Sequence, residues 1–340
     1  MSNRAAWIKT PRAKPFSVDV APAAKAGLGE VVVKNAYLAI NPVDWKIQDY
    51  SPAFQTYPNI LGRDVAGEIV EVGPDVTRLK VGQRVIAHTL SRATGDPKHG
   101  GFQLYTTAHE ITVSPIPDSL PYSQAVVLPL AVSTAAAGLY QKDFLALPYP
   151  TVNPTSTGKS ILIWGGSSSV GSTAIQLAVA SGVDVVSTAS KRNLEYVKAL
   201  GAKHVFDYSD TSVVEHIIAA LNGTKFAGAY DAISSAETLD ATAEVVERLG
   251  GGTIVTVLST PPKRLPISVK AVMVSAVSIA MEQREVGDAV WREYVPKALA
   301  SGQLLAKPDP LIIKGGLEHI QDAVDTLRKG VSAAKVVVQL

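Results

Sequence analysis

The chain has 340 residues, of which 46% are hydrophobic and 18% are charged, and its formal net charge is +2. This balance predicts a compact folded protein of about two domains and excludes a disordered chain or a basic nucleic-acid-binding surface. The absence of cysteine from the sequence excludes disulfides, thiolate zinc sites, iron–sulfur clusters and a cysteine nucleophile. The first residues have no apolar signal segment, and AVMVSAVSIAM is too short to span a bilayer, so we expect a cytoplasmic protein.

The first part of the chain, to about Ala108, has the pattern of a β-rich domain. EVVVKNAYLAI at 30–40 is a candidate pair of strands, and VGQRVIAH at 81–88 is another short strand. Between them, VAGEIVEVG at 65–73 alternates apolar and polar residues and ends in a Gly-Pro-Asp turn. Strands at this spacing predict a partly closed antiparallel β-barrel.

From about Leu128 onward, strand-like and helical patterns alternate. The strands ILIWG, VDVVSTA, AKHVFDY, AYDAIS and GTIVTVL are separated by helical stretches at 171–180, 193–200, 213–221 and 239–249. This alternation predicts a doubly wound parallel sheet of the Rossmann type. The last segment has helical patterns at 286–300 and 317–329 and strands PDPLIIKG and AKVVVQL, and spacing alone does not show where the final strand pairs.

The stretch GGSSSVG at 165–171 follows the first strand of this sheet and opens a helix. Gly166 is expected to permit a tight turn, and Gly171 to let the helix pack closely on the strand. Backbone N–H groups and the positive helix end then face outward, which predicts a pyrophosphate cradle. Ser168 replaces the middle glycine of the G-x-G-x-x-G pattern, so the alternative is an ordinary glycine turn.

The end of the second strand indicates which dinucleotide binds. An NAD site needs a carboxylate there for the ribose 2′-OH, but the residues are Ser190, Lys191, Arg192 and Asn193, and Asp184 lies at the other end of the strand. A hydroxyl followed by two cations suits a 2′-phosphate, so the sequence predicts NADPH. The alternative is that the two cations only begin a solvated helix.

Over nearly its whole length the chain resembles the medium-chain dehydrogenase/reductase superfamily. LGRDVAGEIVEVGPDVTRLKVGQRV is similar to the family's G-H-E-x-x-G…V-G…G-D-x-V segment, and HGGFQLYTTA to its G-G-x-A-E-Y segment. IPDSLPYSQAVVLPLAVSTAAAGL resembles the stretch that leads into the nucleotide domain. The resemblance implies an α/β fold: a GroES-like, partly open β-barrel catalytic domain at 1–127 with 276–340, and a Rossmann domain at 128–275. It also implies that the C-terminal segment returns to the first domain and that the active site lies in the cleft between the domains.

Departures from the family pattern imply its zinc-free branch. Zinc alcohol dehydrogenases have a cysteine where this chain has Asn41, a histidine where it has Arg63, and a third ligand near Leu130 and Ala131. None of these residues can serve here, and the structural four-cysteine lobe is absent from the sequence. The histidines show no metal spacing and are expected at the surface or the core edge: His88, His99, His109, His204, His216 and His319. We therefore expect no metal.

Within that branch, which also holds quinone oxidoreductases, the chain most resembles fungal enoyl reductases that act in trans on polyketide synthases, and similar toxin-cluster reductases. NPVDWK at 41–46, GGSSSV, SKRN with VFDY, and GGLEHIQDAVDTLRKGVSAAKVVV carry this likeness. The glycine loop and the resemblance together imply cofactor contacts at Val43, Asp44, Trp45, Lys46, Gly166, Ser167, Ser168, Ser169, Val170, Gly171, Ser190, Lys191, Arg192, Asn193, Tyr208, Leu258, Ser259, Val331 and Ser332. Two of these, Val331 and Ser332, match less well, because the family has Gly-Lys-Val-Ser-Gly and here the lysine precedes the glycine. Tyr208 can equally be a core-edge residue.

The expected catalytic residues are Lys46 and Thr134, and the expected substrate contacts are Asn41, Thr134, Met273 and Val277. In the reduction of an activated C=C bond a hydride reaches the β carbon, negative charge develops on the carbonyl oxygen, and a proton reaches the α carbon. The Lys46 ammonium is suited to stabilise that charge or to donate the proton, unless it is only a solvated lysine. Thr134 matches a threonine at the mouth of the nicotinamide pocket and can also be a helix N-cap. For Met273 and Val277 the pattern favours plain core over a substrate contact.

The favoured function is therefore NADPH-dependent, zinc-free reduction of an enone or enoyl thioester, either free or tethered to a carrier. Alternatives are an NADPH:quinone oxidoreductase, a non-catalytic nucleotide-binding partner protein, and zinc-free alcohol or aldehyde chemistry. A polyketide synthase partner follows from the resemblance alone, and the near-neutral charge provides no strong docking patch for an acidic carrier. We expect no nucleic-acid or membrane partner, and the sequence does not choose between monomer and homodimer.

Overall fold

The structure, a computed structural model, describes residues 2–259 and 265–340. The chain divides into two compact units: unit 1 contains Met1–Leu130, Trp291–Gly302 and Ala306–Leu340, and unit 2 contains Ala131–Val290 and Gln303–Leu305. The sequence predicts domain changes after residues 127 and 275, whereas the compact units change after residues 130 and 290. Residues 276–290 lie with unit 2, where Ser278 Oγ donates to Gln141 Oε1 at 2.9 Å.

Unit 1 contains two sheets, which agrees with the β-rich domain predicted from the sequence. A seven-stranded sheet has the order β15-β16-β3-β5-β6-β8 with β7 paired to β3, and a three-stranded sheet has the order β2-β1-β4. The strands are β1 (Asn3–Ile8), β2 (Ser17–Ala21), β3 (Glu30–Ala39), β4 (Asn59–Ile60), β5 (Asp64–Val72), β6 (Arg84–His88), β7 (Tyr105–His109), β8 (Val113–Pro115), β15 (Asp309–Ile313) and β16 (Ala334–Gln339). The strand pairs are antiparallel except β15 with β16.

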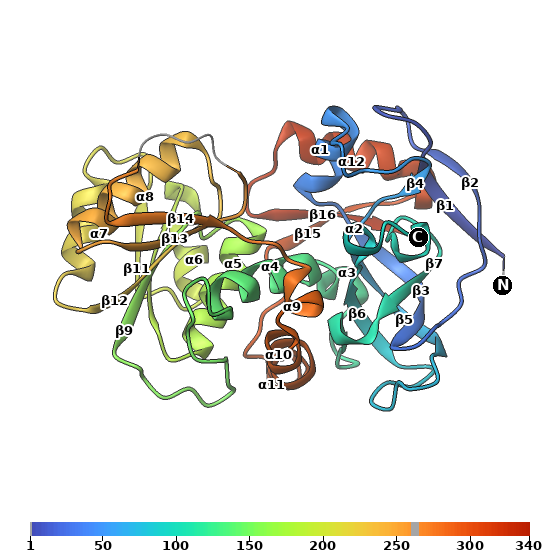
Figure 1. Cartoon of the computed structure of the whole chain (residues 1–340), viewed down its shortest axis with the longest axis horizontal. Helices are drawn as coiled ribbons and strands as arrows, with labels where there is room; N and C mark the ends of the chain where they lie inside the picture. Colours follow the sequence, from blue (N-terminus) through green and yellow to red (C-terminus); the bar gives the residue numbers. More distant parts are fainter. Residues whose placement is uncertain (1, 260–264) are drawn as a thin grey trace. The chain divides into compact units, whose positions relative to one another are not determined.

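The segment at 30–40 forms the single long strand β3, so the predicted pair of strands is wrong. β3 pairs with β5 along one side, and with β7 and then β16 along the other. Val337 of β16 lies opposite Ala39, so the C-terminal strand returns to the first domain, as the resemblance implies. Figure 1 shows this return: the red strand β16 lies next to the blue strand β3, with β15 beyond β16.

Unit 1 also contains α-helices. They are α1 (Pro42–Tyr50), α2 (Ser91–Thr94), α3 (Tyr122–Ala125), α11 (Val295–Ser301) and α12 (Ile320–Lys329). One of them, α11, is the last part of a helical stretch at 284–301 that begins in unit 2. The buried face of α12 presents Ile320, Ala323 and Val324 to the core that also contains Val336 and Val338 of β16. Their spacing of three and four residues is that of one helix face, and burying that face stabilises the helix.

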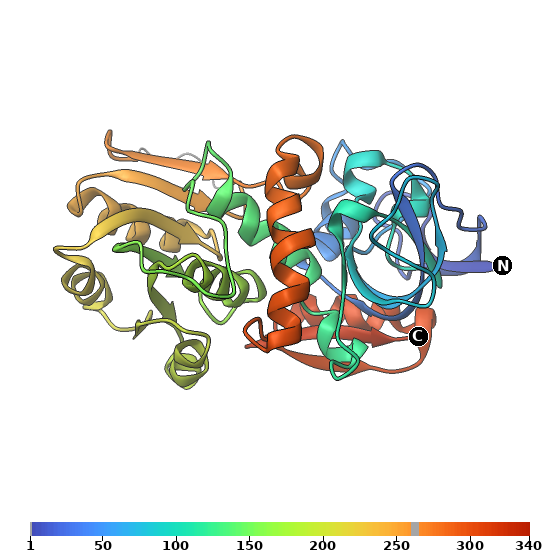
Figure 2. The same cartoon turned by 90° about the horizontal axis from the view of Figure 1, so that it is seen from below.

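Unit 2 is the predicted doubly wound parallel sheet, with one more strand than the sequence indicates. Its six strands have the order β11-β10-β9-β12-β13-β14, and every pair is parallel. They are β9 (Lys159–Trp164), β10 (Asp184–Ala189), β11 (His204–Asp207), β12 (Lys225–Asp231), β13 (Gly252–Thr256) and β14 (Val269–Met273). Figure 2 shows the orange strand β14 at one edge of this sheet. After β11 the chain crosses from one side of β9 to the other and forms β12, so the sheet's topological switch point lies at the carboxyl ends of β9 and β12, where ligands bind in folds of this type.

Unit 2 contains helices close to the four predicted stretches at 171–180, 193–200, 213–221 and 239–249, and further helices outside them. They are α4 (Pro129–Tyr140, whose first residues belong to unit 1), α5 (Ser169–Ala180), α6 (Leu194–Ala199), α7 (Val213–Leu221), α8 (Ala236–Arg248), α9 (Ser278–Met281) and α10 (Arg284–Gly287). A π-helical segment, Asp288–Tyr294, joins α10 to α11. The stretch Tyr122–Tyr140 has the length and hydropathy of a membrane span, but 78% of its most apolar window is buried inside the structure, as in a core helix.

Candidate cofactor and active site

The loop between β9 and α5 has the turn that the sequence predicts, one residue earlier than expected. Gly165 has φ +80°, a left-handed conformation that glycine adopts without strain, whereas Gly166 has no positive φ. The Gly165 N–H donates to Thr188 Oγ1 at 3.0 Å, and the Gly166 N–H donates to the Thr188 carbonyl at 2.8 Å. These bonds to β10 place the turn at Gly165 and correct the assignment to Gly166.

Gly171 brings the first turn of α5 against the end of β9, and Gly166 brings the loop against β10. A Cβ on Gly171 would lie 2.2 Å from the Gly165 carbonyl oxygen, and a Cβ on Gly166 would lie 2.3 Å from Ser187 Oγ. Contacts this short are clashes, so only glycine fits at either position. The close helix-to-strand packing predicted for Gly171 is confirmed.

Serine side chains complete this first turn, and one of them has no partner. Ser168 is the N-cap, and its Oγ accepts the Gly171 N–H at 3.0 Å. Ser172 Oγ donates to the Gly166 carbonyl at 3.0 Å. Ser169 Oγ is buried and has no hydrogen-bond partner within the described part of the chain. An unpaired buried hydroxyl beside a helix N-terminus suits a phosphate oxygen, so these residues fit a dinucleotide pyrophosphate.

The predicted 2′-phosphate residues lie after β10. Lys191 and Arg192 are exposed in a short 3₁₀ turn and form no ion pair with any residue of 2–259 or 265–340. Asn193 Nδ2 donates to Ser190 Oγ at 3.0 Å and closes this turn. Hydrogen bonds from Ser209 and the positive charge of Lys191 lower the pKa of Asp207, at the end of the neighbouring strand β11. The two cations are therefore available to an anion.

The remaining predicted cofactor residues of unit 2 follow the ends of two strands. Tyr208 comes directly after β11 and is 53% exposed. Leu258, half-buried, and Ser259, exposed, come after β13. Because the carboxyl ends of parallel strands share one edge, the structure places these residues at the same sheet edge as the glycine loop and the turn after β10.

The sequence analysis does not predict a role for Asp231, a buried carboxylate at the end of β12 beside the glycine loop. Asp231 is buried and accepts the N–H groups of Ile233 and Ser234 at 3.0 and 2.9 Å and the Thr238 hydroxyl at 2.7 Å. This turn holds Ser234 at φ 59°. It also places the Ile233 side chain, which is 42% exposed, against the glycine loop, because a Cβ on Gly165 would lie 2.5 Å from Ile233 Cγ1. Burial raises the pKa of Asp231. The sequence signal that indicates such a turn is an aspartate at the end of a strand, followed by two serines at the start of the next helix.

In unit 1, Lys46 lies on α1, which begins directly after Asn41. The Lys46 side chain is half-buried, its Nζ lies 5.5 Å from the centre of the Trp45 ring, and burial lowers its pKa. Among the residues that the structure describes, no carboxylate pairs with it. Lys46 is therefore an ammonium that loses its proton more readily than an ordinary lysine.

A buried polar network, formed by Asn41, Asp44, Asp64 and Lys335, surrounds the start of α1. Lys335 Nζ lies 2.5 Å from Asn41 Oδ1 and 2.9 Å from Asp64 Oδ2. Asn41 Nδ2 donates to Asp64 Oδ2 at 2.8 Å, and the Asn41 N–H donates to Asp44 Oδ2 at 2.8 Å. Asn41 is 3% exposed and belongs to this network, and the substrate contact expected of it stays a prediction.

Two further basic groups are buried next to this network. Arg63 is 3% exposed, and burial lowers its pKa to about 10, while burial raises the pKa of Asp44 to about 6. His88 is fully buried, and burial together with the charges of Arg63 and Lys335 lowers its pKa to about 3. The predicted surface or core-edge position is therefore wrong for His88, which is a neutral core residue. The described residues include no group of three or more His, Cys, Asp and Glu arranged to hold a metal.

The remaining predicted residues lie in different parts of the chain. Thr134 is 9% exposed inside α4, so it is not a helix N-cap, and its carbonyl accepts the Tyr230 hydroxyl at 2.8 Å. Met273 ends β14 and is 47% exposed, whereas Val277 lies beyond that strand and is half-buried. In unit 1, Val331 packs against the core and Ser332 is exposed, in the loop before β16.

Residues 27–118 match the family of alcohol dehydrogenase GroES-like domains, and residues 169–300 match the zinc-binding dehydrogenase family. A trans-enoyl reductase of Aspergillus japonicus, himH, is 50% identical over 341 residues, which cover 99% of this chain and 97% of that protein. The chain belongs to the medium-chain dehydrogenase/reductase superfamily. Members of this superfamily are oxidoreductases, so the predictions of an oxidoreductase and of a nicotinamide cofactor are confirmed.

Solved structures of the superfamily have the same architecture. An alcohol dehydrogenase superfamily protein from Novosphingobium aromaticivorans has 27% identity and a TM-score of 0.81, with 99% of each chain covered. The CurK enoyl reductase has 19% identity and a TM-score of 0.76, again with 99% of each chain covered. The predicted superfamily fold, a GroES-like domain with a Rossmann sheet, is confirmed.

Proposed function

We propose that the protein is an NADPH-dependent, zinc-independent enoyl reductase that reduces the activated C=C bond of an enone or enoyl thioester. The observation that carries this proposal is Lys46, a half-buried ammonium with a lowered pKa and no carboxylate partner among the described residues. The trans-enoyl reductase of A. japonicus, 50% identical along 99% of the chain, supports the same reaction.

Lys46 is suited to two tasks in such a reaction, the stabilisation of negative charge and the delivery of a proton. When bound, NADPH supplies a hydride for the β carbon of the substrate. The Lys46 ammonium then stabilises the negative charge on the carbonyl oxygen, and its lowered pKa favours delivery of a proton to the α carbon. Thr134, from α4, is proposed to hold the carbonyl or the nicotinamide amide.

Zinc independence is supported by what surrounds Asn41 and Arg63. The Lys335 ammonium lies 2.5 Å from Asn41 Oδ1, and Arg63 is a second buried cation. Two buried positive charges repel a divalent cation, and neither side chain is a metal ligand while protonated. The preference for NADPH is supported by Lys191 and Arg192, which are exposed and have no ion-pair partner in the described chain.

The test is turnover by the purified protein with NADPH or NADH and a panel of enones, enoyl thioesters and quinones. We expect oxidation of NADPH with enoyl substrates. Turnover with quinones alone would favour a quinone oxidoreductase, and binding of NADPH without any turnover would favour a non-catalytic partner protein. Comparison of a free crotonyl thioester with a carrier-bound one distinguishes a free substrate from a tethered one, the form expected if a polyketide synthase is the partner.

Lys46→Met tests the role of the lysine itself. We expect kcat to fall about tenfold or more while the Kd for NADPH stays within about threefold, because the change removes transition-state stabilisation. Lys80→Met, at an exposed lysine of the same unit, is the matched control. An unchanged kcat in Lys46→Met would contradict the role.

A further inference from the structure

Lys335 lies on β16, far along the chain from α1, and its side chain is 4% exposed. Its ammonium contacts Asn41 Oδ1 at 2.5 Å and Asp64 Oδ2 at 2.9 Å. We propose that this ammonium fixes the first turn of α1 and thereby the place of the Lys46 amino group, which makes Lys335 a positioning residue. The inference rests on the function proposed for Lys46.

Asn41 connects Lys335 to the helix. It has an extended backbone, φ −123° and ψ 156°, and Pro42 begins α1 directly after it. Its side-chain oxygen Oδ1 accepts from the Lys335 ammonium, its side-chain nitrogen Nδ2 donates to Asp64, and its backbone N–H donates to Asp44. The start of the helix is thus held from three directions by short, buried hydrogen bonds, each of which involves a charged side chain.

The Lys335 ammonium also balances the charge of the network. Asp44 and Asp64 are both fully buried, and their carboxylates repel each other. Asp44 Oδ1 accepts the Gly62 N–H at 3.3 Å, so the first turn of α1 is tied to the segment before β5. Without the ammonium, Asp64 would lose its ion pair and Asn41 would lose the group that orients its side chain.

The other end of α1 is anchored independently by contacts with α12, so a change in the Lys335 network acts on the first turn of the helix and not on its last turn. Arg328 of α12 pairs with Asp49 at 3.0 Å, and Gln48 Nε2 donates to Gln321 Oε1 at 2.8 Å. The buried residues of α1 are Asp44, Ile47 and Gln48, and Lys46 lies between them on a half-buried part of the helix. A change in the first turn is therefore transmitted to Lys46 within less than one helical turn.

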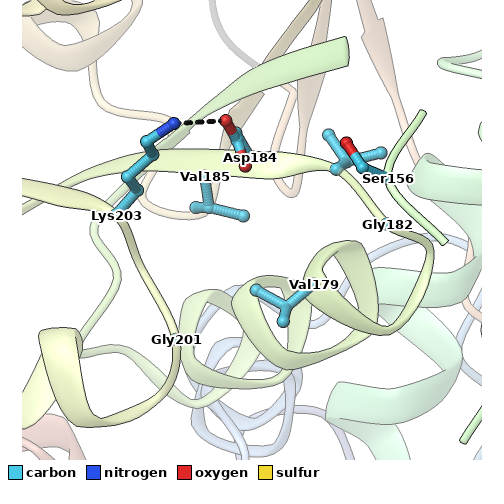
Figure 3. Close-up of a pocket in the computed structure, with 8 residues that line it drawn as sticks. Ser156, Val179, Gly182, Asp184, Val185, Gly201 and Lys203 are labelled. Atoms are coloured by element: carbon cyan, nitrogen blue, oxygen red, sulfur yellow. Dashed lines mark hydrogen bonds and ion pairs between the residues drawn. The ribbon is translucent and has the colours of Figure 1, made fainter. Parts of the chain in front are cut away.

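The test compares Lys335→Met/Asp64→Asn with wild type. The double substitution removes both charges, because Lys335→Met alone leaves Asp64 buried without its ion pair and is expected to lower stability. Lys335→Arg keeps the positive charge. The matched control is Lys203→Met/Asp184→Asn, which removes a lysine–aspartate pair of 2.6 Å that is exposed at the start of β10. Figure 3 shows this control pair beside a surface hollow of about 220 Å³ that also involves Ser156 and Val179.

The readout is the pH dependence of Lys46 acetylation, followed by mass spectrometry of its peptide without cofactor or substrate. In Lys335→Met/Asp64→Asn we expect the midpoint for Lys46 to rise by about half a pH unit or more, as the amine becomes better solvated. Labelling of Lys80 should not change, and the control variant should behave as wild type. An unchanged midpoint for Lys46, or equal changes at Lys46 and Lys80, would overturn the proposal. The labelling stays interpretable even if the protein reduces no enoyl substrate, so this failure is separate from failure of the proposed function.

A kinetic cycle completes the test once enoyl reduction is established. We expect Lys335→Met/Asp64→Asn to lower kcat about tenfold, to leave the KM for NADPH unchanged, and to have no further effect when Lys46 is already methionine. Lys335→Arg should retain most of the activity. Independent, multiplicative losses from the two changes would contradict a role that acts through Lys46.

Discussion

Lys335→Met is the substitution whose effect on stability follows most directly from the structure. Methionine nearly fills the same space, so the change removes the charge and little of the packing. It leaves the Asp64 carboxylate, which is fully buried, with the N–H groups of Asn41 and Leu130 at 2.8 and 2.6 Å. We expect the free energy of unfolding to fall sharply, because a buried charge then loses its counter-ion.

The size of the loss follows from the geometry. Opposite charges 2.9 Å apart attract by about 6 kcal/mol at an effective dielectric constant of about 20, and the cost of desolvating the ammonium offsets roughly half of this. We therefore expect a loss of about 3 kcal/mol. Lys203→Met removes an equally short ion pair whose side chains are 58% and 55% exposed, and it should cost less than about 1 kcal/mol.

Urea unfolding at pH 7.5, followed by tryptophan fluorescence, measures both losses in the full chain. Trp7, Trp45 and Trp291 report on unit 1, which contains Lys335, and Trp164 reports on unit 2, which contains Lys203. Lys335→Met/Asp64→Asn should recover at least half of the loss, because it removes the unpaired charge as well. A loss in Lys335→Met no larger than that in Lys203→Met would refute the reasoning.

Three further predictions concern other parts of the molecule. The folded protein holds His88 neutral with a pKa of about 3, against the usual 6.5, so it loses stability as the pH falls below about 6.5 and the unfolded chain takes up a proton. Between pH 7 and pH 5 this amounts to about 2 kcal/mol, and urea titrations should show His88→Gln losing that much less than wild type. Lys191→Ala/Arg192→Ala should raise the Kd for NADPH about tenfold or more and leave that for NADH unchanged in calorimetric titrations, and equal weakening of both would contradict a 2′-phosphate site. Gly171→Ala places a Cβ 2.2 Å from the Gly165 carbonyl oxygen, so it should cost about 1–3 kcal/mol and reduce the thermal shift that NADPH produces.

The sequence predicts unit 2 well because its signals are local. Helix α7 occupies the predicted residues 213–221, and its apolar positions repeat with the helical period. The prediction failed at β3, where Lys34 and Asn35 interrupt the apolar run and resemble a turn. In the structure Asn35 is buried, and its side-chain amide donates to the Gln103 carbonyl at 2.8 Å and to Thr106 Oγ1 at 2.7 Å. Those partners lie far along the chain, so no local pattern reveals them.

The candidate site shows the same contrast. The glycine loop and NPVDWK are visible as short patterns, but which of two adjacent glycines takes the positive φ depends on bonds from β10. The bond between Asn41 and Lys335 joins residues 294 positions apart, and a lysine in an apolar strand gives no sign of its partner. Likewise, the burial of His88 follows from the way β6 packs and not from its sequence neighbours.

The pairing of β3 with β16 has a consequence for how the nascent chain folds. Unit 2 uses nearly continuous sequence, so it can form as soon as its last strand and helices have left the ribosome. Unit 1 cannot form that early, because β3 pairs through Ala39 with Val337 of the last strand, and the network at the start of α1 includes Lys335 of the same strand. The helix that carries Lys46 is therefore set into place among the last events of synthesis, and a truncated product would lack it in its working position.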